Sequence, residues 1–213
     1  MALQVVAKPA KSPWATVRDR ESERAEKREA VLHAAAQAFS EKGYYRTSLD
    51  DIAERLGITK PTLYYYAKNK EDLIAAVMDR ALEQMLMDLP IDPYASAYDQ
   101  LRVFLKNYAE VAATDFGTCL IQLRHAGLSD ATDARIRTGK AAIDTRIRHF
   151  LELGIADGSV ADCDVKLTAF MIAGAVNGIS HWYRPGAGLD AASVAEVYVN
   201  QLGAGLRPRV QNF

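Results

Sequence analysis

The chain has 213 residues, which is enough for one large domain or for a small domain joined to a medium one. Hydrophobic residues (49%) and charged residues (25%) occur in globular proportions, and a net charge of −1 argues against a protein that coats nucleic acid with its whole surface. No apolar run is long enough to span a membrane and the N-terminus lacks the pattern of a signal peptide, so we expect a cytoplasmic protein without a membrane partner.

The first 26 residues are expected to form an N-terminal arm that continues as a helical extension. Charges of both signs alternate over residues 17–29, which is typical of an exposed helix with ion pairs along its surface. From Val31 to Phe39 apolar residues recur at helical spacing, and Gly43 provides a C-terminal stop. We therefore place the start of a first domain near residue 27.

Two short helices are predicted next, over residues 48–56 and 59–66. Thr47 and Asp50 have the spacing of a capping box, and Gly57 ends the first helix. Thr59 can cap the second helix, and Pro61 lies in its first turn, where a missing N–H has no cost. Two short helices joined by a glycine-containing turn form a helix-turn-helix, in which the second helix enters the major groove of DNA.

The surface of this unit carries groups suited to DNA. Residues 55–70 contain four basic residues and no acidic one, which is the footprint of a DNA-binding surface, although an ordinary solvated face would also carry such charges. Tyr64 and Tyr65 would both be exposed, which is rare on an ordinary helix, while Ile58 and Leu63 would face inward. The first domain, at residues 27–75, is thus predicted to bind DNA.

The remaining residues, 76–213, are predicted to be helical as well. Asn69 caps a helix that stops before Pro90, and further helices are expected near residues 98–112, 118–125, 130–155, 163–183 and 190–206. No alternation of period two is long enough for a sheet. We expect an all-α protein, with an N-terminal three-helix helix-turn-helix domain and a larger C-terminal helical domain.

Residues 28–77 resemble the DNA-binding domain of TetR-family repressors. The resemblance rests on AQAF at residues 36–39, GYYRTSLDDIA at 43–53, GITKPTLYY at 57–65 and KNKEDL at 68–73. Tyr66 and Ala67 depart from it, because they stand where the family usually has histidine and then phenylalanine. The missing phenylalanine implies local repacking of the small core.

The resemblance implies a homodimeric transcriptional regulator, most simply a repressor, on a palindromic operator in double-stranded DNA. Lysines and helix N-termini are natural partners of phosphate, which agrees with the implied contacts. The residues that the resemblance places at DNA are Thr47, Ser48, Thr59, Lys60, Pro61, Thr62, Tyr64, Tyr65 and Lys70.

The resemblance also implies that the C-terminal domain binds a small-molecule effector and dimerises through its last two long helices. Small residues at 173–175 and 178 would allow a partner helix to approach closely. Residues 181–186 look similar to members that respond to acyl-CoA compounds. A mainly hydrophobic effector suits the candidate pocket residues Phe104, Tyr108, Phe116, Leu120, Phe150 and Trp182.

Two alternatives are an enzyme and a helical ligand-binding or adaptor protein without DNA binding. The four histidines lie on separate predicted helices without a nucleophile elbow or phosphate loop, so we expect no catalytic residue and no cofactor. Cys119 and Cys163 match no metal-ligand spacing, so we expect no metal. An adaptor that had lost DNA binding should carry acids or deletions within residues 55–70, and this chain has neither.

Overall fold

A computed structural model describes residues 17–123 and 127–208, and the regular secondary structure within these ranges is entirely helical. This confirms the all-α fold class. The first 16 residues of the expected arm and the end of the helix expected near 118–125 lie outside the described residues. The described helices are α1 (Val17–Lys42), α2 (Leu49–Leu56), α3 (Lys60–Tyr64), α4 (Lys70–Leu86), α5 (Ala97–Ala112), α6 (Asp115–Gln122), α7 (Asp130–Ala156), α8 (Val165–Trp182) and α9 (Ala191–Leu206).

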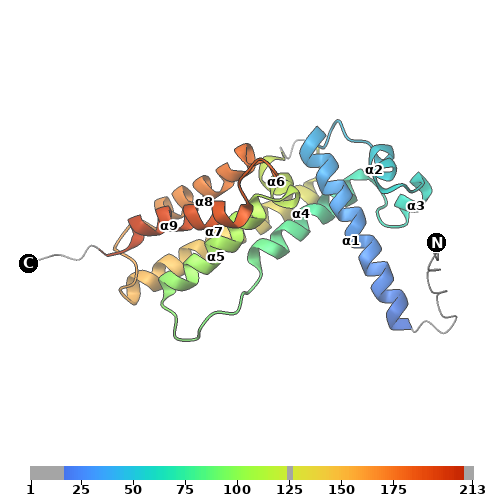
Figure 1. Ribbon diagram of the computed structural model, residues 1–213. Coiled ribbons are helices and arrows are strands. Elements are labelled where there is room, and N and C mark those ends of the chain that lie inside the picture. The colour runs from blue at the N-terminus through green and yellow to red at the C-terminus, as the bar shows by residue number, and fades with distance from the viewer. Residues whose placement is uncertain (1–16, 124–126, 209–213) are drawn as a thin grey trace, which may run out of the picture.

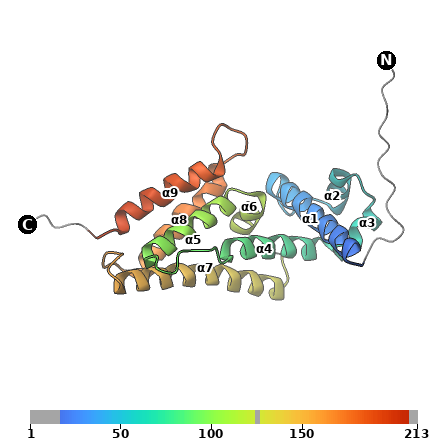
Figure 2. The same ribbon diagram turned by 60° about the horizontal axis from the view of Figure 1, so that its bottom comes forward.

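Two groups of helices lie at opposite ends of the molecule, and α4 connects them. Figure 1 shows α1, α2 and α3 at one end and a bundle of α5 to α9 at the other. Helix α4 packs on α1 at one end of the molecule and on α5, α6 and α7 in the bundle. Figure 2 shows α7 and α9 on opposite sides of α5 and α8. A movement of α4 would therefore change its packing against both groups of helices.

The charged extension and the following buried stripe form a single helix, α1, of 26 residues. Val31, Ala35 and Phe39 are buried, as their spacing predicts, and Gly43 ends the helix with a φ of 82°. The boundary expected after residue 26 lies inside α1, and the one expected after residue 75 lies inside α4. The proposed domains are thus joined by continuous helices.

Helix α6 ties the first group of helices to the bundle. It packs against α1, α4, α5 and α8. The hydroxyl of Ser40 in α1 donates to the Asp115 carboxylate at 2.5 Å, and the Cys119 thiol lies 3.5 Å from the Ala36 carbonyl oxygen. Cys119 is buried, and burial raises the pKa of its thiol to about 12.

None of the helices in the described part of the chain combines the length and the apolar character needed to cross a lipid bilayer.

Candidate nucleic-acid interface and ligand cavities

Helix α2 begins with a capping box formed by Ser48 and Asp51. The Ser48 hydroxyl accepts the Asp51 N–H at 3.1 Å, and the Asp51 carboxylate accepts the Ser48 N–H at 2.8 Å. Lys42 donates to the same carboxylate at 2.6 Å, and these hydrogen bonds hold the pKa of Asp51 far below its usual value. The capping box expected to start at Thr47 is therefore one residue out of register.

Thr47 lies inside the protein, with 2% of its surface exposed. Its hydroxyl lies 3.0 Å from the Ala38 carbonyl oxygen and 2.9 Å from that of Gly43, and it has a single proton to donate to them. The Thr47 side chain therefore connects the end of α1 with the turn before α2. The expected DNA contact of the Thr47 side chain is wrong, because DNA cannot reach it.

Helix α3 is short and is held by one apolar side chain. Thr59 caps it by accepting the Thr62 N–H at 3.4 Å, and Pro61 lies in its first turn, as expected. Leu63 is fully buried and Ile58 is half-buried, which confirms that these two residues face inward. The helix ends at Tyr64, two residues earlier than expected.

The opposite side of α3 is open to solvent. Lys60, Pro61 and Thr62 are exposed, and the exposed fractions of Tyr64 and Tyr65 are 48% and 74%. The Lys60 ammonium pairs with the Asp50 carboxylate of α2 at 2.8 Å. A row of hydroxyl, methyl and ammonium groups on one helix face is suited to base edges and phosphates.

Lys70, at the first position of α4, has a structural role that the sequence did not reveal. Its ammonium donates to the carbonyl oxygens of Tyr44 at 3.0 Å and of Thr47 at 3.1 Å. It also lies 4.4 Å from the centre of the Tyr44 ring. Since an ammonium has three N–H groups, one donor remains for another partner. Lys70 thus sets the position of the turn before α2 relative to α4.

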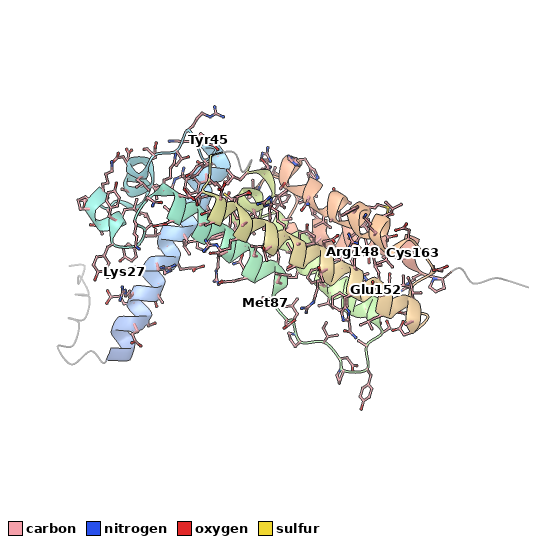
Figure 3. All side chains as sticks on the ribbon, turned by 180° about the vertical axis from the view of Figure 1, so that it is seen from behind. Lys27, Tyr45, Met87, Arg148, Glu152 and Cys163 are labelled. Atoms are coloured by element: carbon pink, nitrogen blue, oxygen red, sulfur yellow. The ribbon has the colours of Figure 1, made fainter. Side chains whose placement is uncertain are left out.

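Helix α1 reaches the far end of α3. The Arg24 guanidinium lies 5.8 Å from the centre of the Tyr65 ring. Next to it, a cavity of about 180 Å³ lies between α1, α4 and the end of α3, bordered by Arg28 and Ala67. Ala67, around which the sequence predicts repacking, lies at the border of this cavity. Figure 3 labels Lys27 on α1 and Met87 directly after the C-terminal end of α4.

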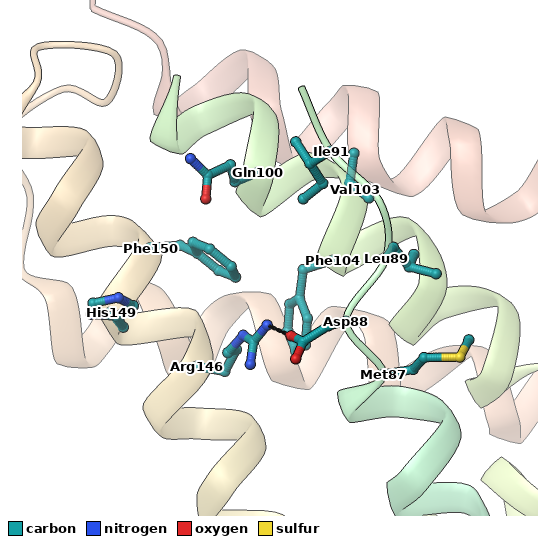
Figure 4. A pocket seen from close by; sticks show the side chains of 10 residues that line it. All are labelled: Met87, Asp88, Leu89, Ile91, Gln100, Val103, Phe104, Arg146, His149 and Phe150. Carbon is teal, nitrogen blue, oxygen red and sulfur yellow. Dashed lines mark hydrogen bonds and ion pairs between the residues drawn. The ribbon is translucent and has the colours of Figure 1, made fainter. Parts of the chain in front are cut away.

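The six candidate pocket residues do not share one cavity. Phe104 and Phe150 line an open pocket of about 380 Å³ at the end of α4 (Figure 4). Tyr108 and Leu120 line a second cavity, of about 120 Å³, inside the bundle. The remaining two lie elsewhere, because Phe116 packs edge-on against a histidine of α1 and Trp182 is 46% exposed and stacks on a tyrosine of α9. The six candidate residues are therefore divided between two cavities and two other places in the structure.

Two polar side chains that line the cavity inside the bundle form a hydrogen bond with each other. The Tyr108 hydroxyl donates to Asn177 Oδ1 at 2.6 Å, and burial raises the pKa of this phenol. Burial lowers the pKa of Lys140, which lines the same cavity. This small space suits a water molecule or part of a ligand better than a whole effector.

Helix α8 carries an apolar stripe that the other described residues of the chain leave largely exposed. Leu167, Phe170 and Met171 are 63%, 53% and 56% exposed, and Gly174 continues the stripe with open space where a Cβ would lie. Val197 of α9 is 59% exposed. A contiguous apolar face of this kind marks a surface for another protein chain.

Known proteins match both halves of the chain. Residues 31–77 match the family model described as bacterial regulatory proteins, tetR family, and residues 94–206 match the tetracyclin repressor-like C-terminal domain. The regulator RutR of Escherichia coli K12 is 30% identical over 151 residues, which cover 68% of this chain and 70% of RutR.

Two further relatives cover most of the chain. The transcriptional repressor KstR2 of Mycolicibacterium smegmatis is 26% identical over 195 residues, 85% of this chain and 91% of KstR2. The second is AibR, whose crystal structure is in complex with isovaleryl coenzyme A and operator DNA. It superimposes on this chain with a TM-score of 0.68 and 25% sequence identity, and the alignment covers 82% of this chain and 97% of AibR.

Proposed function

The chain belongs to the TetR family of helix-turn-helix transcriptional regulators, and from this premise we propose that it is a repressor that a small, mainly hydrophobic effector releases from a palindromic operator. The observation that carries the proposal is the form of α3, a short capped helix anchored by the buried Leu63 with its other side open. The matching proteins are transcriptional regulators, which are not enzymes.

We assign DNA contacts to the exposed residues around α2, α3 and the start of α4. Ser48, at the N-terminus of α2, and Lys70 are proposed to meet phosphates, since helix N-termini and ammonium groups favour anions. Lys60 and Thr62 are proposed to reach base edges in the major groove. The full set is Ser48, Thr59, Lys60, Pro61, Thr62, Tyr64, Tyr65 and Lys70.

Regulators of this family act as dimers, and we propose that the uncovered stripe of α8, together with α9, forms the dimer interface. Residues 27–75 would then bind DNA, and residues 76–213 would bind the effector and dimerise. Small side chains near Gly174 favour close packing of two α8 helices. The AibR complex contains isovaleryl coenzyme A, which supports an acyl-CoA-like effector as the finer proposal.

Selection of binding sites from random duplex DNA tests the proposed function. We expect two inverted half-sites whose centres lie about 10 bp apart or somewhat more, because each protomer offers one recognition helix. Recovery of only asymmetric sites, or of none, would contradict operator binding by a symmetric dimer.

Replacing Lys70 by alanine tests the proposed phosphate contact. Affinity should fall about equally for all DNA sequences, and the slope of log K against log salt should become shallower by about 1 per half-site. Thr62→Ala should instead change the preference at one base pair by about 1–3 kcal/mol.

Lys70→Arg is the matched control, because it retains the positive charge. A Lys70→Ala variant that changed base preference at an unchanged salt slope would show that Lys70 does not lie at a phosphate.

A further inference from the structure

The open pocket at the end of α4 is lined by both apolar and polar side chains, and one of the polar ones is the cation Arg146. Figure 4 shows apolar side chains around it from the segment after α4, from α5 and from α7. These are Met87, Leu89, Ile91, Val103, Phe104 and Phe150. Its volume of about 380 Å³ lies within the range of small-molecule sites. The polar groups at its edge come from Asp88, Gln100, Arg146 and His149.

Arg146 is held in place by two aromatic rings. Its guanidinium lies 6.0 Å from the centre of the Phe104 ring and 5.5 Å from that of Phe150. Contacts of this kind orient the guanidinium and withdraw part of it from water. Arg146 therefore lies at the pocket beside both rings, with part of its side chain withdrawn from water.

Asp88 supplies the anion that Arg146 now binds. Its carboxylate accepts a hydrogen bond from the guanidinium, as the dashed line in Figure 4 marks. The Asp88 side chain is 84% exposed, whereas that of Arg146 is 36% exposed. Among the described residues that line the pocket, Asp88 has the only carboxylate. Arg146 thus lies in the wall of the pocket on α7. Asp88 lies on the exposed segment after α4, which has no helical structure.

We propose that the effector is an apolar carboxylate whose anionic group replaces Asp88 on Arg146. This inference rests on the proposed function, because it names the ligand and the mode of release of the same regulator. A carboxylate forms paired hydrogen bonds with a guanidinium, and an alkyl or ring portion would cover Phe104 and Phe150. The phosphates of an acyl-CoA compound offer the same kind of anion from a different source.

The exchange also explains how the pocket acts on DNA binding. Asp88 follows the last residue of α4, Leu86, by two positions, so its pair with Arg146 ties the end of α4 to α7. The other end of α4 begins at Lys70, which fixes the turn before α2. A ligand that takes Arg146 from Asp88 removes this contact at the end of α4, while the Arg135–Asp79 pair still joins α7 to the middle of α4. The end of α4 can then shift relative to α7. The change in operator affinity equals the difference in ligand affinity between the tied and released states.

Octanoate, octanamide and octanoyl-CoA, titrated into the full chain by calorimetry, test the inference. We expect octanoate to bind about threefold to tenfold more tightly than octanamide, which has the same shape without the charge. Arg146→Gln should abolish this preference. Arg137→Gln is the matched control, because Arg137 forms an exposed ion pair with Asp133 on the same helix and does not line the pocket.

Asp88→Asn tests the exchange itself. Octanoate should bind this variant about threefold to tenfold more tightly than the unmodified protein, while octanamide should bind equally to both. The effect of octanoate on binding to the selected operator should shrink, because the tie that it breaks is already absent.

Three results would overturn the inference. The first is equal binding of octanoate and octanamide, or no binding of octanoate, by a protein that still binds its operator. The second is an Arg146→Gln variant that keeps the preference for octanoate. The third is binding of octanoyl-CoA without octanoate, which would assign the anion to the coenzyme. Failure to bind any selected operator would instead contradict the proposed function.

Discussion

Met171→Glu is expected to give a folded monomer that binds the operator about 100-fold more weakly, or weaker still, than the unmodified protein. Met171 is 56% exposed in the single chain and lies between Phe170 and Gly174 on the apolar stripe of α8. In the proposed twofold-symmetric interface the substitution adds one carboxylate from each protomer, so two negative charges would be buried there. Burying two like charges opposes association, and a monomer loses the second half-site.

Sedimentation or light scattering measures the oligomeric state, and titration of the selected operator measures the affinity. Thr138→Glu is the matched control, since it adds the same charge to an exposed position of α7 away from the stripe. A Met171→Glu variant that remained dimeric would show that the interface lies on another face.

The helix-turn-helix could be predicted closely from the sequence because its signals are local. Gly57 adopts a φ of 64°, which glycine accepts more readily than other residues, and it ends α2 where the sequence indicates. Thr59 and Asn69 cap the helices that follow them, as their side chains and positions predict. Each of these signals acts within about one helical turn, so no knowledge of distant contacts is needed.

Contacts between distant residues account for the errors in the DNA-binding half. Thr47 and Ser48 are both hydroxyl residues before a helix, and the sequence cannot show which of them turns inward. The hydroxyl of Thr47 lies within hydrogen-bond distance of the Ala38 carbonyl oxygen, nine residues earlier in the chain. Ser48, which points outward, therefore caps α2. Lys70 likewise reaches carbonyl groups more than 20 residues away.

In the C-terminal half, too, the sequence cannot show which residues line the same cavity. Phe104 and Phe150, two of the candidate pocket residues, are buried and line one pocket. Helical periodicity does not show which helices surround a space, so the sequence gives no reason to separate Phe116, which packs against α1, from these two residues. Arg146 cannot be predicted as a pocket residue from the sequence, because a basic residue on a charged helix gives no sign of the two rings beside it. Pocket residues become apparent only when the helices are assembled.

Gly117 is a position where the assembled helices leave no room for a side chain. It lies in α6, and a Cβ built there would be 2.0 Å from the Val111 carbonyl oxygen and 2.7 Å from the Ala112 Cα. Both are backbone atoms of the last turn of α5, so they cannot rotate away as the end of a side chain does. The Gly117 N–H also donates to the capping hydroxyl of Thr114 at 3.1 Å.

Gly117→Ala is therefore expected to destabilise the protein by about 3 kcal/mol or more, since overpacking against backbone exceeds the usual cost of an added methyl group. The variant must push α6 away from α5, and α6 also packs on α1 and α4, so operator binding should weaken as well. Urea denaturation at one fixed protein concentration measures the change.

Gly205→Ala in α9 is the matched control, because a Cβ there meets open space and should stabilise the helix by about 0.5–1 kcal/mol. If both variants were as stable as the unmodified protein, the close approach of α6 to the end of α5 would be wrong.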